Sequence, residues 1–261
     1  MNPYLILLAV FVLAALLIVY VFKNVGRKEI IKDNLIQSET IQEILENKVG
    51  FYARMNIEDK EVFGERVSYF LQNTKISPEK GALLTDEDKV LIAASATIPL
   101  IHFQHWAYEN LDEVLVYPDY FDEKFDTVSE GRNVAGMVGT GALNHKMILS
   151  LPALRAGFLK YPQGNTAIHE FVHLIDKADG EIDGIPEYLI PKELIQPWLQ
   201  EMDKTIREIR KGKSDIREYA ATNDAEFLAV VSEYFFKKPN ALKEDHPHLY
   251  ALLEEIYNRK K

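Results

Sequence analysis

The sequence contains no cysteine, and this absence excludes several kinds of chemistry at once. Disulfide bonds, thiolate metal sites and cysteine nucleophiles are ruled out, so a metal ion could be held only by histidine, aspartate and glutamate side chains. Basic residues are in the minority, with 30 Lys and Arg against 40 Asp and Glu and a net charge of −10. Without a basic stripe to neutralise phosphates, nucleic acid is not expected as a partner.

Internal repeats and low-complexity tracts are also missing from the 261 residues, of which 47% are hydrophobic and 27% charged. Such a composition is typical of a globular protein with a hydrophobic core, and the length suits one domain with an appendage. Apolar residues recur at helical spacing from Ile41, and residues 85–88 (TDED) are typical of a capping box ahead of an apolar helix. Residues 114–118 and 147–152 are rich in apolar residues and end in proline, which predicts two short strands, with loop and hairpin over 119–145.

These patterns predict an α+β fold in which helices dominate a small sheet. The expected domain runs over residues 41–261, with a helical N-terminal part at 41–112, a central part at 113–240 and a C-terminal helix at 241–261.

The N-terminal residues 4–22 form an uncharged run of 19 residues, long enough to cross a bilayer as a helix. A cleaved signal peptide is the alternative, but no basic segment precedes the run and no small-x-small cleavage site follows it. Four basic residues lie between positions 23 and 32, so the positive-inside rule places the following domain in the cytoplasm. We expect a transmembrane anchor over 1–22 with the N-terminus outside, a juxtamembrane linker over 23–40, and residence in the bacterial inner membrane.

The most specific motif is His-Glu-x-x-His at residues 169–173, inside an apolar segment of helical character. On a helix, His169 and His173 lie on one face and can bind one metal ion, while Glu170 can reach a water molecule on that metal. Zinc suits two neutral imidazoles plus a carboxylate, and it activates water near neutral pH. The alternative is a chance pattern of two core histidines and a surface glutamate. Since a catalytic zinc has three protein ligands, a third one must come from elsewhere in the chain.

Asp179 is one candidate for that ligand. Several zinc hydrolases have a third histidine six residues after the second, with a glycine between them that turns the chain. Here the glycine position is occupied by Asp176, so the helix is expected to carry Asp179 away from the metal.

A better candidate lies in residues 224–236, an almost wholly apolar helix on which Glu226 and Glu233 share one face. A carboxylate that faces a core needs a charge partner or a metal. Glu226 could instead complete a capping box with Asn223, and Glu233 could be an exposed glutamate or part of a structural ion pair.

Taken together, these segments resemble the Mlc titration factor A peptidases and, more distantly, the catalytic domain of anthrax lethal factor. The resemblance covers roughly residues 41–258 and includes the metal-site motif with its flanks, residues 165–176 (NTAIHEFVHLID). It also includes residues 113–118 (EVLVYP), 183–186 (DGIP) and 223–236 (NDAEFLAVVSEYFF), with Tyr219 seven residues before Glu226.

The resemblance implies a zincin-like peptidase domain of the gluzincin type, with the zinc site in the central part. His169, His173 and Glu226 would bind one Zn²⁺, Glu170 would act as general base and then as proton shuttle, and Tyr219 would hydrogen-bond the oxyanion of the tetrahedral intermediate.

Three further residues are candidates for orienting the imidazoles: Asn165, Asp176 and Glu233. For Asn165 and Asp176, which share a helix face with His169, the alternatives are helix capping and an ordinary surface role.

The sequence thus predicts a zinc-dependent metallopeptidase in which Glu170 assists the attack of water on a peptide bond. Residues 147–151 are expected to form a strand at the edge of the cleft, to which an extended peptide could add. The alternative is a regulatory module that binds a protein and has little or no peptidase activity, because members of the resembled family bind a sugar-responsive transcriptional repressor. Aminopeptidase and endopeptidase action remain equally open.

Overall fold

A computed structural model describes residues 35–159, 164–186 and 189–258 of the chain. The predicted anchor over 1–22 and most of the predicted linker over 23–40 lie outside these residues. Within the described ranges, none of the helices combines the length and the apolar character needed to span a bilayer.

Helices α2 (Ser38–Lys48), α3 (Gly50–Ala53), α4 (Ile57–Asn73) and α5 (Asp86–Leu100) form the N-terminal half of the core. The predicted capping box at the start of α5 is present, because Thr85 and Asp88 each accept a backbone N–H from the other residue. From Val90 to Leu100 every residue of α5 is buried, so this helix is central to the core.

A four-stranded sheet packs beside these helices. Its strands are β1 (Lys75–Pro78), β2 (Glu113–Tyr117), β3 (Gly136–Val138) and β4 (Lys146–Ser150), in the order β1-β2-β4-β3. The pairs β1–β2 and β2–β4 are parallel, whereas β3 runs antiparallel to β4. The strands β2 and β4 were expected from sequence, and β3, which pairs with β4 in antiparallel fashion, lies in the part expected to be loop and hairpin. Strand β1 falls in the part expected to be helical.

The predicted place of the second strand in the sheet was wrong. Residues 147–151 were expected at the edge of the cleft, but β4 lies between β2 and β3, so both of its sides are already paired. Strand β4 ends at Ser150 because the hydroxyl of Ser150 caps the next helix, α6 (Leu151–Gly157). The edge strand on this side of the sheet is β3, and β1 is the edge strand on the other side.

A charged row ties three strands together at one end of the sheet. Glu113 on β2 lies opposite Lys75 on β1 and Lys146 on β4, and its carboxylate oxygens are 2.9 Å and 2.7 Å from the two ammonium groups. Burial opposes ionisation of Glu113, but hydrogen bonds from Lys146, Ser77 and Lys75 prevail and lower its pKa to about 2.

The C-terminal half of the chain is helical. After α7 (Thr166–Asp176) and a short 3₁₀ turn, it contains α8 (Lys192–Arg210), the 3₁₀ turn η4 (Glu218–Ala221) and α9 (Asp224–Lys237). One C-terminal helix was expected over 241–261, but the chain forms two, α10 (Pro239–Asp245) and α11 (Pro247–Tyr257). The break falls before Pro247, which lacks the N–H that a continuous helix would need and fits the first turn of a new one.

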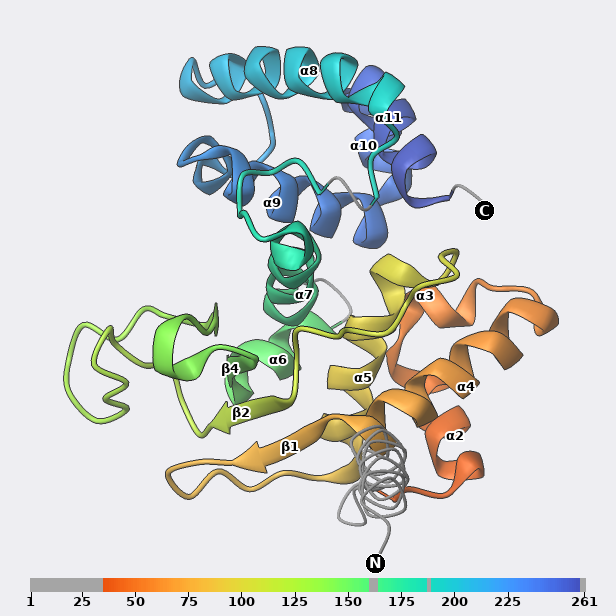
Figure 1. Ribbon diagram of the computed structural model, residues 1–261, viewed down its shortest axis with the longest axis vertical. Coiled ribbons are helices and arrows are strands. Elements are labelled where there is room, and N and C mark those ends of the chain that lie inside the picture. The colour runs from red at the N-terminus through yellow and green to blue at the C-terminus, as the bar shows by residue number, and fades with distance from the viewer. Residues whose placement is uncertain (1–34, 160–163, 187–188, 259–261) are drawn as a thin grey trace, which may run out of the picture.

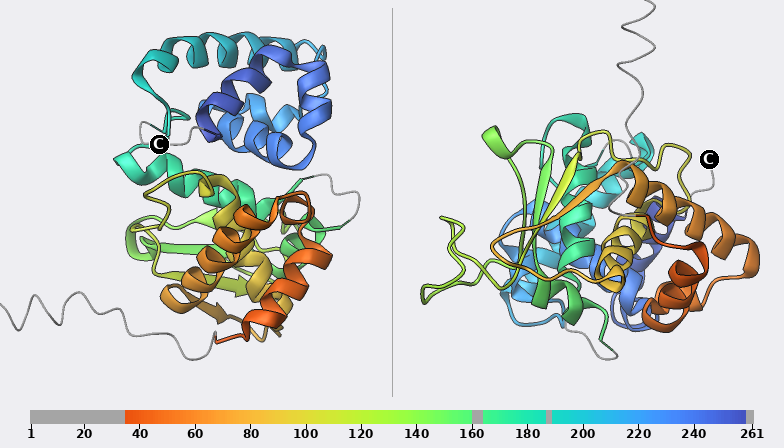
Figure 2. Two further views of the ribbon diagram at one scale, coloured as in Figure 1. Left: turned by 90° about the vertical axis from the view of Figure 1, so that its right-hand side faces the viewer. Right: turned by 90° about the horizontal axis from the view of Figure 1, so that it is seen from below.

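Figures 1 and 2 show how these parts meet: α8 to α11 lie on one side of α7, and the sheet with α2 to α6 lies on the other. Helix α7 therefore runs through the middle of the molecule, in contact with α5, α9 and β3. For the described residues, the predicted helix-rich α+β class is confirmed.

Candidate metal centre

Helix α7 presents both histidines of the predicted motif. The helix begins after Asn165, whose side-chain oxygen accepts the N–H of Ile168 at 3.0 Å. Every residue from Ala167 to Asp176 is buried, which fixes the helix against its neighbours on all sides. His169 and His173 lie one turn apart on the face that meets α9.

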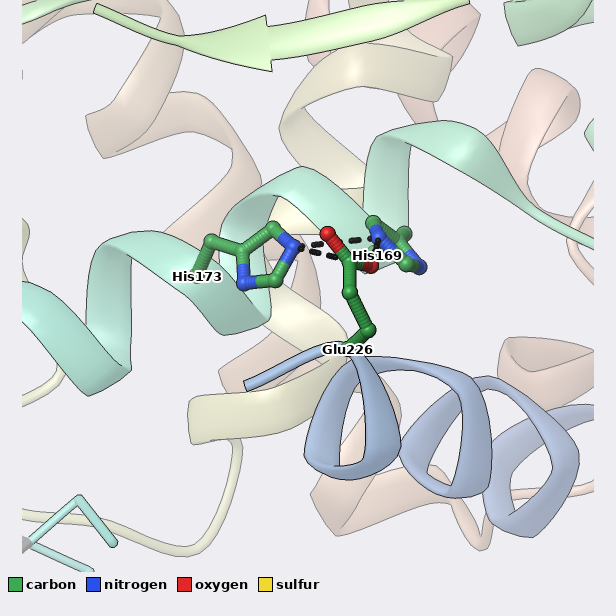
Figure 3. Close-up of side chains that lie close together, drawn as sticks. All are labelled: His169, His173 and Glu226. Carbon is green, nitrogen blue, oxygen red and sulfur yellow. Dashed lines mark hydrogen bonds and ion pairs between the residues drawn. The ribbon is translucent and has the colours of Figure 1, made fainter. Parts of the chain in front are cut away.

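Glu226 comes from the first turn of α9 and points toward the two imidazoles (Figure 3). Its Oε2 atom lies 2.9 Å from Nε2 of His169 and 3.5 Å from Nε2 of His173, and the two nitrogens are 3.1 Å apart. Ligand atoms at about 2.0–2.1 Å from a tetrahedral zinc lie about 3.3–3.4 Å from one another. The three side chains therefore have the identity and nearly the spacing of a three-ligand metal site, and they could hold one ion.

The pKa values of His169 and Glu226 are both shifted strongly by their contact with each other and, for His169, with Glu233. Burial opposes a charge on His169, but its hydrogen bonds to Glu226 and Glu233 outweigh burial and raise its pKa to about 10. Burial also opposes the charge on Glu226, yet the two imidazoles hold the pKa of this carboxyl well below its ordinary value. The carboxylate is thus ionised and directed at the imidazole nitrogens, as a metal ligand must be.

Glu233, one of the three predicted orienting residues, contacts the first histidine. Its Oε1 atom lies 2.9 Å from Nδ1 of His169, so Nε2 of that ring is the nitrogen left for a metal. Arg217 donates to the same oxygen of Glu233 at 2.6 Å, and the backbone N–H of Asn165 donates to the other oxygen. Sequence reasoning missed Arg217, because nothing in its local sequence indicates that it lies beside α9.

The other two predicted orienting residues do not hydrogen-bond either imidazole. Asn165 acts as the N-cap of α7. Asp176 is fully buried, and its Oδ2 atom accepts the backbone N–H of Gly184 at 2.9 Å. Burial raises the pKa of Asp176 to about 6. Nδ1 of His173 and Oδ1 of Asp176 are both buried and without a hydrogen-bond partner in the described part of the chain.

Asp179, the alternative third ligand, lies in the 3₁₀ turn that follows α7 and accepts the N–H of Glu181. It is not part of the His169, His173 and Glu226 cluster. The sequence argument against it, that the helix would carry it away from the histidines, agrees with this position.

Glu170 faces a cleft of about 690 Å³ that is also lined by His173, Glu226 and the edge strand β3. Its side chain is buried, and burial raises the pKa of its carboxyl. Strand β3 lies directly against this side chain at Gly136, a contact that no sequence pattern indicated.

Tyr219 is half-exposed on η4. Its ring centre lies 6.0 Å from that of His169. Burial of the hydroxyl and the negative charge of Glu226 raise the pKa of Tyr219 to about 12, so the phenol is protonated at neutral pH and can donate a hydrogen bond.

Comparisons with known proteins agree with the resemblance seen in the sequence. An uncharacterised protein of Synechocystis sp., slr2042, is 30% identical over 229 residues, which is 83% of this chain and 82% of the relative. Mlc titration factor A of Pectobacterium atrosepticum is 28% identical over 227 residues, 81% of this chain and 83% of the relative. The corresponding protein of Serratia proteamaculans is 28% identical over 203 residues, 72% of this chain and 76% of the relative.

The family model described as glucose-regulated metallo-peptidase M90 matches residues 22–258, a range that contains the two histidines, Glu170 and Glu226. The expected relationship to Mlc titration factor A is thereby confirmed, and this chain belongs to the glucose-regulated metallo-peptidase M90 family.

Proposed function

We propose that the protein is a zinc-dependent metallopeptidase of the gluzincin type, with a zincin-like catalytic domain. The observation that carries this proposal is the convergence of His169, His173 and Glu226 at a cleft that also contains the carboxylate of Glu170. A structural zinc usually has four protein ligands, whereas a catalytic zinc has three and an open position. Three ligands beside a free carboxylate fit the catalytic case.

His169, His173 and Glu226 would hold the ion. When bound there, Zn²⁺ supplies a Lewis acid that polarises a carbonyl and lowers the pKa of water. Glu233 fixes the ring of His169 by its contact with Nδ1, so that Nε2 is the nitrogen at which a metal would replace a proton.

Glu170 is the proposed general base. It follows His169 directly on α7, and its carboxylate faces the cleft. Because burial raises its pKa, this carboxylate accepts a proton more readily than an exposed glutamate. It takes a proton from the attacking water and then delivers it to the amine that leaves.

Tyr219 is the proposed hydrogen-bond donor to the oxyanion. Its raised pKa keeps the proton on the phenol, and its ring lies beside that of His169. A donor placed where charge develops during reaction lowers the barrier more than it stabilises the substrate.

The edge strand β3 replaces residues 147–151 as the proposed docking strand for the substrate. Gly136, Met137 and Val138 line the cleft, and in the described part of the chain β3 has a neighbouring strand on one side only. An extended peptide could add to the open side of β3 and pass in front of Glu170. This arrangement suits peptide or protein substrates and leaves the choice between aminopeptidase and endopeptidase action to experiment.

The names of the relatives favour a second candidate function. They are called Mlc titration factor A, which suggests that this chain could bind a regulatory protein. The two candidates differ in their need for Glu170, because binding of a regulator does not use a base beside the metal.

From the sequence alone we also propose that residues 4–22 anchor the protein in the bacterial inner membrane, with the domain in the cytoplasm. Protease added to intact spheroplasts should leave the domain whole and should degrade it after lysis. Degradation before lysis would place the domain on the other side.

The test of the proposed activity compares the full-length protein with Glu170→Gln for zinc content and for cleavage of aminoacyl and internally quenched peptides. We expect one zinc in both proteins and hydrolysis only by the wild type. The exposed Glu123→Gln is the matched control and should cleave as the wild type does.

Zinc without cleavage by either protein would favour the regulatory function. Absence of zinc would refute the assignment of His169, His173 and Glu226 as ligands.

A further inference from the structure

A second cavity, of about 450 Å³, lies where the start of α7 meets the end of α9. It is lined by residues at the start of α7 and at the end of α9, together with residues of α3, α5 and α6. Figure 1 shows α3 beside the C-terminal end of α9, where these elements meet. The cavity shares none of its described lining residues with the cleft that contains Glu170.

Four cationic side chains and no carboxylate are found among the described residues that line this cavity: Lys48, Arg54, Lys237 and Lys238. Such a concentration stands out in a chain with a net charge of −10. Lys48 already pairs with Glu87 at 3.0 Å. For the other three cations, the described part of the chain offers no carboxylate oxygen within 4 Å.

Lys237 is the most unusual member of the group. It is half-buried, and its ammonium donates hydrogen bonds to the backbone carbonyls of Gly157 and Gly164. Burial, opposed by the charge of Glu233, lowers the pKa of Lys237 to about 8. Carbonyl groups satisfy the N–H donors but do not neutralise the charge, and a buried charge without a counter-ion is costly.

The charge of Glu233 attracts Lys237, but this carboxylate is shared with other donors. It lies one turn before Lys237 on α9, and its two oxygens already accept from His169, Arg217 and the backbone of Asn165. Attraction to carbonyls at the C-terminal ends of α2 and α9 explains why lysines occur there. This attraction to carbonyl groups does not explain why Lys237 is half-buried.

The cations lie together. Arg54 reaches from the end of α3 to the carbonyl oxygen of Phe236, at 3.5 Å from Nη2, and Lys237 and Lys238 follow Phe236 directly. The guanidinium is therefore next to the backbone that carries both lysines. Arg54, Lys237 and Lys238 therefore line the cavity around the end of α9.

Apart from Asn165, the other described lining residues are apolar or glycine, and four of them are large side chains from four helices: Phe51 on α3, Ile98 on α5, Ile168 on α7 and Phe236 on α9. A cavity of this size, with apolar walls and a few converging polar groups, has the usual features of a small-molecule site.

We propose that this cavity binds a small amphipathic anion, in which a carboxylate or phosphate group pairs with Arg54, Lys237 and Lys238 while an aliphatic or aromatic body contacts Phe51 and Phe236. The proposal does not depend on peptidase activity. Its anion forms the direct ion pair that Lys237 lacks among the described residues, and its body fills the apolar part of the cavity.

The test is isothermal titration of the full-length protein with octanoate, phenyl phosphate and inorganic phosphate as separate probes. Octanoate, phenyl phosphate or both should bind at one site per chain, and inorganic phosphate should bind more weakly because it has no apolar body. The preferred head group distinguishes a carboxylate ligand from a phosphate ligand. The double variant Arg54→Gln with Lys238→Gln should bind the probes about tenfold or more weakly, because charge-assisted hydrogen bonds are lost.

Two controls make the result specific. The variant Lys211→Gln with Lys213→Gln loses the same charge from an exposed turn and should bind as the wild type does. His173→Ala should also bind normally, since it alters only the metal centre; loss of binding there would assign the anion to a metal ion and overturn the proposal.

The proposal is also refuted if the wild type shows no saturable binding at millimolar probe, or if the Arg54 and Lys238 double variant binds equally well while its melting temperature is unchanged.

Discussion

A carbon atom added to the Cα of Gly136 would lie 2.7 Å from both Cγ and Oε1 of Glu170. Non-bonded carbon atoms pack at about 3.5–4.0 Å, so β3 can lie this close to the carboxylate only because residue 136 has no side chain. The proposed docking strand for the substrate and the proposed general base are thus in direct contact.

Gly136→Ala should therefore reduce peptide hydrolysis. The new methyl group must push either β3 or Glu170 aside, and it would also meet Cγ2 of Thr166 at 2.8 Å. Displacement of a catalytic group by a fraction of an ångström justifies an expected loss in kcat/KM of roughly 10- to 100-fold. Zinc content should not change, because the atoms nearest to the added carbon belong to Glu170 and Thr166 and not to a metal ligand.

Gly64→Ala is the matched control, since a Cβ at this position of α4 meets no other atom within 4 Å. It should leave kcat/KM unchanged and should not lower the melting temperature, because alanine favours a helix over glycine. If Gly136→Ala retained full activity, the proposed place of β3 over the base would be wrong.

Tyr219→Phe should lower kcat about 100-fold while the protein keeps its zinc, because the substitution removes only a hydroxyl that donates to the oxyanion. KM should change much less than kcat, since the hydrogen bond strengthens in the transition state. Kinetics on a fluorogenic peptide and metal analysis of the same preparation check both statements. Loss of zinc from Tyr219→Phe would instead make Tyr219 a ligand.

Local sequence was sufficient for part of the site. His169 and His173 could be paired from their spacing, because four residues on a helix bring two side chains to one face whatever the rest of the fold does. The same applies to Asn223, which caps α9 through the N–H of Glu226 at 2.9 Å. Of the capping box considered for Glu226, only the bond from its backbone N–H to Asn223 is present, because its carboxylate turns to the imidazoles.

What could not be predicted depends on contacts between distant segments. Strand β3 has three residues, too few to display an alternating pattern, and it exists through its pairing with β4. The order of the strands is equally a long-range property, which is why β4 was expected at an edge that β3 occupies. Arg217 and Gly136 are informative only once α9 and α7 are in place beside them.

The free energy of unfolding should depend on Glu113 in a pH-dependent way. The folded pKa of this carboxyl, about 2, is below the ordinary value of 4.5, so its ion pairs stabilise the protein above pH 4.5. That stabilisation is lost as the pH falls from 4.5 toward 2.

Glu113→Gln should thus cost about 1 kcal/mol near pH 7, since both lysines are partly exposed, and progressively less below pH 4.5. Urea unfolding at several pH values measures the difference between the two proteins. The exposed Glu61→Gln should show no such difference. If the difference in free energy of unfolding between the wild type and Glu113→Gln stayed constant down to pH 2.5, the lowered pKa would not belong to Glu113.

Glu233→Gln tests whether the contact of Glu233 with Nδ1 of His169 supports zinc binding. The glutamine can still accept from Nδ1 of His169, but it lacks the charge that opposes Arg217 and strengthens the imidazole as a ligand. Zinc affinity should fall about 10- to 100-fold, measured by competition with a chelator, while the exposed Glu255→Gln should bind zinc normally. Arg217→Gln should weaken zinc binding less, because the carboxylate remains on His169. If Arg217→Gln lost as much affinity as Glu233→Gln, the ion pair rather than the contact to Nδ1 would be what positions the ring.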